Sequence, residues 1–271
     1  MKFAMLVMFE LRAIKKTINT LYKHIIDPYD ADIFILCQRQ FEDDDKNIQL
    51  FDRKVIHREL YDKSDPHLFF NNDVTKIYPS LNWNNYGQLQ MYINFYKMAE
   101  VIKPYINDYD YFLFFRSDIE VLFPFPDREL FEKVDKGLYT IDPEYTKNCG
   151  GIGHPMYIHK DYILPFLTCS YDKIVSATKD DNFSKTNQEW FLTLSMRRQK
   201  MEYSLFKNIN YFYTVETLQD YTTWSTPQVH PVYKILCKKP QQVNEAYSNL
   251  KLWNEGYRWG IKNGTIMLIK D

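Results

Sequence analysis

A continuous apolar run, Tyr111 to Phe115, leads directly into acidic residues and then into prolines. Such a run is typical of a strand covered on both faces, because strands in parallel sheets lose the alternation seen in half-exposed strands. Asp118 and Glu120 follow the run, so their carboxylates are expected at the carboxyl edge of a sheet, where open α/β folds bind ligands. Carboxylate oxygens are hard ligands for divalent cations. The pattern therefore predicts a metal-bound nucleotide site.

The N-terminal part of the chain has a strand–helix–strand pattern. Lys2 to Met8 reads as a first strand, Ala13 to His24 has apolar residues at helical spacing, and Asp32 to Cys37 is a second short strand. The Asp27-Pro28 pair between them predicts a turn. A long helical pattern, Asn84 to Ile106, precedes the aromatic strand. This order predicts an α/β fold with a mostly parallel sheet.

The rest of the chain gives weaker signals. The polar run from Glu42 to Asn47 predicts a solvated loop. The other expected elements are a strand near Lys54–Ile56, a short helix near Arg128–Val134, a strand at Leu138–Ile141, helices at Ile163–Cys169 and Gln188–Gln199, an amphipathic stretch at Gln242–Trp253 and a strand at Thr265–Ile269.

Composition excludes several classes of protein. Lysine and arginine total 34 against 35 aspartate and glutamate residues, and no segment is strongly basic, so nucleic-acid binding is not expected. No stretch has the roughly 18 apolar residues of a membrane span. Residues 1–9 are apolar but too short for a signal peptide. The four cysteines are widely spaced, which argues against a zinc knuckle or a disulfide framework and favours a reducing, cytoplasmic location.

The segment from Arg116 to Glu120, Arg-Ser-Asp-Ile-Glu, resembles the Asp-x-Asp motif of GT-A glycosyltransferases, which that family places at the end of a strand. If Asp118 is the metal-binding member, Arg116 replaces the first aspartate; otherwise Asp118 and Glu120 form an Asp-x-Glu variant. The first two strands and the block Tyr109–Asp118 are also similar to glycosyltransferase-related proteins of bacterial surface-polysaccharide loci and large DNA viruses. The resemblance covers roughly residues 1–200.

This resemblance implies a GT-A, Rossmann-like fold. It implies a catalytic domain over residues 1–220, with a nucleotide-binding half at 1–125 and an acceptor half at 126–220. Residues 221–271 would form a C-terminal extension packing on or near the active site.

The resemblance also implies a donor site. The donor would be a UDP- or GDP-linked sugar, held with Mn²⁺ or Mg²⁺ that neutralises the diphosphate. The expected metal ligands are Asp118, Glu120 and His230. The residues expected to line the donor pocket are Phe9, Glu10, Arg12, Arg116, Ser117, Gly150, Gly151 and His154. Glycines let the backbone approach the donor closely.

Glu189 is the candidate base, with Asp180 and Asp181 as substitutes, because inversion requires a carboxylate that deprotonates the acceptor hydroxyl. Ordinary roles stay open for several of these residues. Arg12 can be a surface charge at a helix start, the glycines can form a simple turn, and Glu189 suits the first turn of a helix through the macrodipole alone.

The function expected is therefore metal-dependent, inverting transfer of a hexosyl or pentosyl group to a hydroxyl of a glycan or glycoprotein. One alternative is a catalytically inactive carbohydrate-binding or scaffold protein of the same fold. A second is a sugar nucleotidyltransferase, although residues 9–12 lack the glycines of a phosphate-binding loop. A glycosidase would also use paired carboxylates, but it needs no metal–diphosphate site.

Overall fold

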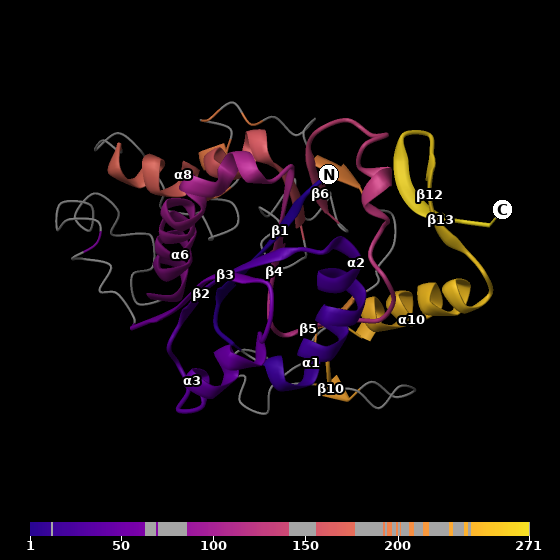
Figure 1. The fold of residues 1–271 in the computed structure, drawn as a ribbon, viewed down its shortest axis with the longest axis horizontal. Coiled ribbons are helices and arrows are strands. Elements are labelled where there is room, and N and C mark those ends of the chain that lie inside the picture. The colour runs from indigo at the N-terminus through magenta and orange to yellow at the C-terminus, as the bar shows by residue number, and fades with distance from the viewer. Residues whose placement is uncertain are drawn as a thin grey trace.

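A mostly parallel sheet between two layers of helices forms the centre of the computed structural model (Figure 1). The residues that the structure describes are 1–11, 13–62, 69, 86–140, 156–176, 192, 194–196, 199, 201, 206–208, 214–216, 228–229, 236–237 and 240–270. The α/β fold class and the mostly parallel sheet flanked by helices, expected from the sequence, are confirmed.

Within the described part, the central sheet has seven strands in the order β3-β2-β1-β4-β7-β6-β8. Their bounds are β1 Phe3–Phe9, β2 Asp32–Gln38, β3 Val55–Tyr61, β4 Tyr111–Phe115, β6 Leu138–Thr140, β7 Met156–His159 and β8 Phe206–Asn208. β7 pairs antiparallel with both β4 and β6, and the other pairings in this sheet are parallel. Only β7 therefore runs against the common direction of these described strands.

Helices cover both faces of this sheet. α1 (Ile14–Leu21) and α2 (Asp27–Tyr29) lie on one side, while α6 (Tyr86–Ile102) and α8 (Lys160–Val175) lie together on the other (Figure 1). The remaining described helices are α3 Asp44–Asn47, α10 Pro240–Asn254, the π-helix η1 Tyr22–Ile26 and the 3₁₀ turns η2 Ile48–Leu50, η3 Lys103–Asp108 and η4 Arg128–Leu130. None of the helices in the described part is long and apolar enough to cross a membrane.

Successive strand residues supply two separate cores. On β1, Ala4, Leu6 and Met8 pack in the core that contains α6 and α8. Phe3, Met5 and Val7 pack in the core that contains α1 and α2. Because side chains alternate along a strand, a continuous apolar run is what two buried faces require. All five residues of β4 are at most 1% exposed, which agrees with the strand predicted at 111–115.

The C-terminal residues pack on the segment that follows β5 (Ile119–Val121), a short strand paired with β9 (Thr214–Glu216). The Phe123 ring stacks on Trp253 and Trp259, with centroids 5.4 and 5.9 Å apart. The Trp259 indole also donates to the Pro124 carbonyl at 2.7 Å. Trp253 lies in the last turn of α10 (Pro240–Asn254), and Trp259 lies on a hairpin of β12 (Arg258–Lys262) and β13 (Thr265–Ile269). A further short pair joins β10 (Gln228–Val229) to β11 (Leu236–Cys237).

Three local predictions were wrong. The Asp27-Pro28 pair does not form a turn but begins α2, and the chain reverses at Asp30, whose φ of 52° is left-handed. Proline is tolerated there because it occupies the first turn. The run from Glu42 to Asn47 contains α3, at Asp44–Asn47, and buries Asp44 and Asn47. The helix expected near Arg128–Val134 is only the turn η4.

Acid should destabilise this fold partly through His159, which precedes α8. Its Nδ1 accepts from the Asp161 amide at 3.3 Å, and burial lowers the pKa of the imidazole from its ordinary 6.5 despite the opposing charge of Asp161. A lowered pKa means that the unfolded state binds the proton more readily. The contribution to stability is therefore complete above about pH 6.5 and is lost as the pH falls through the folded-state pKa.

His159→Asn keeps an acceptor for the Asp161 amide but removes the titration. We expect urea unfolding to show a smaller loss of stability for this variant than for the wild type between about pH 7.5 and about pH 5.5. The pKa of His24 is also lowered by burial, so the stability of the variant should still depend on pH to some extent. Equal slopes for wild type and variant would contradict the role given to His159.

Candidate functional site

The carboxyl ends of β1 and β4 lie next to each other and form the edge on which the candidate site is built. The two strands are parallel, and Val7 pairs with Phe115 at their ends. From β1 the chain passes through α1 to β2 on one side, whereas β4 lies on the other side of β1. This reversal of strand order is a topological switch point, where open α/β sheets bind ligands in the crevice beyond the strand ends.

The loops after these two strands are tied to each other and to α1. The Ser117 hydroxyl donates to the Glu10 carbonyl at 2.7 Å, and the buried Thr17 hydroxyl donates to the Ser117 carbonyl at 2.6 Å. One turn later, the Val121 amide donates to the Thr20 hydroxyl at 3.4 Å. The predicted neighbours Glu10 and Ser117 are therefore brought together, and the segment after β4 is held in a fixed position.

Ala13 gives the loop after β1 its shape. Its φ of 50° lies in the left-handed region, and its carbonyl accepts from the Lys16 amide at 2.8 Å to begin α1. This conformation costs a residue with a Cβ roughly 1–2 kcal/mol. Backbone strain of this kind collects at binding sites, and here it lies in the same loop as Glu10.

Arg116 and Asp118 form a two-point ion pair. The Nε atom of Arg116 donates to Oδ1 of Asp118 at 3.0 Å, and its Nη2 donates to Oδ2 at 2.6 Å. The Asp118 side chain is 5% exposed, whereas that of Arg116 is 21% exposed. The turn after β4, in which the Ile119 amide donates to the Arg116 carbonyl at 3.3 Å, places both side chains on one side. Such paired, charge-assisted bonds are the strong class in proteins.

Glu120 lies on β5 and is half-buried, and burial raises the pKa of its carboxyl. It pairs through the backbone with Val215 of β9, so a second short sheet positions it. The motif therefore bridges two sheets, with its arginine and first acidic residue after β4 and its second acidic residue on β5.

The arrangement does not fit a divalent cation bound by Asp118. Both carboxylate oxygens accept from Arg116, and a cation there would lie beside a permanently charged guanidinium. Among the residues described, no group of three or more His, Cys, Asp or Glu side chains is placed to hold a metal.

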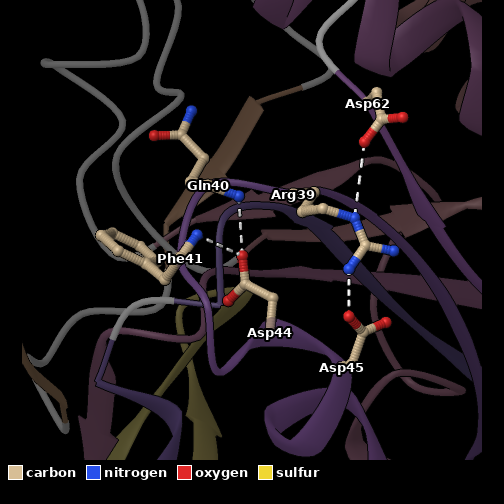
Figure 2. Close-up of polar contacts among 6 residues, drawn as sticks. All are labelled: Arg39, Gln40, Phe41, Asp44, Asp45 and Asp62. Carbon is tan, nitrogen blue, oxygen red and sulfur yellow. Dashed lines mark hydrogen bonds and ion pairs between the residues drawn. The ribbon is translucent and has the colours of Figure 1, made fainter.

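A second polar arrangement lies at the same edge, beyond the ends of β2 and β3 (Figure 2). Oδ2 of Asp44 accepts from the Gln40 and Phe41 amides at 2.7 and 2.9 Å and so fixes the loop after β2. Arg39 bridges Asp45 and Asp62, which joins this loop to the end of β3. Sequence reasoning missed this arrangement, because a run of charged residues gives no sign that Asp44 is fully buried.

Several predicted site residues fall outside the described part of the structure. They are Arg12, Gly150, Gly151, His154, Glu189 and His230. The substitute bases Asp180 and Asp181 also lie outside the described part. Phe9 ends β1, but its side chain is outside the described part. The structure thus brings together Glu10, Arg116, Ser117 and Asp118, with Glu120 close in the chain.

What the described residues offer chemically is a guanidinium held by the Asp118 carboxylate beyond the ends of β1 and β4. A guanidinium is suited to phosphate, because its planar N–H groups match two phosphate oxygens. Comparison with protein-family models and with curated proteins gives no match to this sequence.

Proposed function

We propose that this protein is a GT-A glycosyltransferase that transfers a sugar from a UDP- or GDP-linked donor to a hydroxyl of a glycan or glycoprotein. The observation that carries the proposal is the location of the Arg116–Glu120 motif, which starts beside the end of β1 at the switch point of the sheet. A nucleotide bound there would place its diphosphate beyond the ends of β1 and β4.

In the proposed reaction, the acceptor oxygen attacks the anomeric carbon, and the bond from that carbon to the diphosphate oxygen breaks. The electron pair leaves with the diphosphate, and a carboxylate takes the acceptor proton; Glu189 is the predicted base. In this proposal Arg116 binds the diphosphate, and Asp118, which accepts two hydrogen bonds from the guanidinium, holds it in position. Ser117 and Glu10 hold the two loops together.

The other predicted features remain part of the proposal. These are inversion at the anomeric carbon and the cytoplasmic location, whereas the Mn²⁺ or Mg²⁺ expected at Asp118, Glu120 and His230 is not retained. Because both carboxylate oxygens of Asp118 accept from Arg116, this aspartate is unsuited to bind a metal, and the proposed reaction assigns no step to a metal. A scaffold or carbohydrate-binding protein of the same fold would have no need of a nucleotide, and a nucleotidyltransferase would bind nucleoside triphosphates and release pyrophosphate.

Calorimetric titration of UDP and GDP, each with Mn²⁺ and with EDTA, tests this function. We expect one of the two nucleotides to bind the wild type, and we expect Asp118→Asn to weaken that binding roughly tenfold, by about 1.4 kcal/mol, because the guanidinium loses its ionic partner.

The matched control is Asp32→Asn. Asp32 also forms an ion pair, with Lys2 at 3.1 Å, but it lies at the start of β2, on the opposite edge of the sheet. The control should bind like the wild type. Absence of binding for both nucleotides under all conditions would overturn the transferase proposal and favour the scaffold.

A further inference from the structure

The Arg116–Asp118 pair stands where a metal-dependent transferase would need a free carboxylate. Two bonds, at 2.6 and 3.0 Å, commit both oxygens of Asp118 to one guanidinium. Arginine keeps its charge at every pH at which proteins fold. A divalent cation at Asp118 would have to break this pair and then share the site with the displaced positive charge.

Exposure distinguishes the two partners. Only 5% of the Asp118 side chain is exposed, but 21% of the Arg116 side chain is. A ligand that enters from solvent therefore meets the cation, while the anion lies behind it.

The position of Arg116 also suits an anionic ligand. It is the first residue after β4, and its neighbour Ser117 is bonded to the loop that follows β1. Thr17 of α1 fixes the same segment, so the guanidinium is presented by a rigid turn at the switch point.

We infer that Arg116 supplies the positive charge that binds the donor diphosphate, and that nucleotide binding at this site requires no divalent cation. This inference rests on the proposed function. Asp118 is a positioning residue in this arrangement, because it acts by orienting Arg116. A preorganised cation of this kind stabilises the charge that develops on a departing phosphate.

The test is titration of UDP and GDP in EDTA and in Mn²⁺ into wild type, Arg116→Lys and the double variant Arg116→Gln/Asp118→Asn. The double variant removes both charges together, so no buried carboxylate is left without its partner. We expect equal affinity in EDTA and in Mn²⁺ for the wild type. We also expect roughly 10- to 100-fold weaker binding by the double variant. The loss of affinity should be smaller for Arg116→Lys, which keeps the charge but not the paired N–H donors of the guanidinium.

Arg53→Gln is the matched control. Arg53 is also paired with a carboxylate, that of Asp27 at 2.9 Å, but it precedes β3 at the opposite edge of the sheet. Circular dichroism confirms folding of each variant before titration.

Two outcomes would overturn the inference and leave the transferase proposal standing. The first is wild-type binding that appears only with Mn²⁺, and the second is EDTA-resistant binding that the double variant retains. Absence of nucleotide binding by the folded wild type in both EDTA and Mn²⁺ would overturn the proposed function and the inference together.

Discussion

Replacing Phe95 with alanine is expected to lower the free energy of unfolding by about 3–5 kcal/mol. Phe95 is fully buried on α6, and its ring contacts Phe114 of β4 and Phe166 of α8 edge-on, at centroid distances of 5.8 and 5.6 Å. Three separate elements therefore meet at this ring. None of them can move into the space without losing its other contacts, so a cavity would remain.

Val175→Ala is the control for Phe95→Ala. Val175 ends α8 and is 50% exposed, so its truncation should change stability by less than about 0.5 kcal/mol. Urea unfolding followed by circular dichroism measures both variants. A loss for Phe95→Ala no larger than that of Val175→Ala would show that α6 is not packed between β4 and α8 as described.

The strands at the centre of the sheet were predictable because their sequences carry one clear signal. β1, β2 and β4 are continuous apolar runs, and such runs suit strands with two buried faces. Their parallel direction followed from the helical segments between them. Boundaries shifted by a residue or two, since β1 begins at Phe3 rather than Lys2.

The antiparallel strand β7 was missed for a physical reason. It has four residues, Met156–His159, and it follows a glycine-rich segment that reads as a turn. A strand this short gains its stability from pairing with β4 and β6, which local sequence does not reveal. α8 extends beyond the predicted Ile163–Cys169 at both ends and contains Pro165. Burial of Phe166 and Leu167 offsets the hydrogen bond that this proline cannot donate.

For the candidate site, the loops that meet were predicted, but the ion pair within it was not. The resemblance placed Glu10 and the motif after β4 in one donor pocket, and a hydrogen bond from Ser117 to the Glu10 carbonyl joins their loops. The pairing of Arg116 with Asp118 was not foreseen. In an extended segment the side chains of residues 116 and 118 would lie on one face of the strand without touching. The turn from Arg116 to Ile119, closed by the Ile119 amide, brings the two side chains into contact.

This pair should also show an asymmetric effect on stability. Arg116→Gln is expected to cost about 2–4 kcal/mol, because it takes the guanidinium away from a carboxylate that is almost fully buried. Asp118→Asn should cost less, about 1–2 kcal/mol, since the more exposed Arg116 can be hydrated by solvent.

The double variant separates the pairwise interaction from the cost of each single change. With both charges removed, Arg116→Gln/Asp118→Asn should lose less stability than the sum of the single variants, which gives a coupling energy of about 0.5–3 kcal/mol. Urea unfolding of all four proteins, in low and in high salt, measures it; an exposed pair would lose its coupling in salt, whereas this one should keep most of it. Additive losses would mean that the guanidinium and the carboxylate do not stabilise each other. In that case Asp118 would remain available to other ligands, so the same cycle that measures stability also tests whether the site carries its own cation.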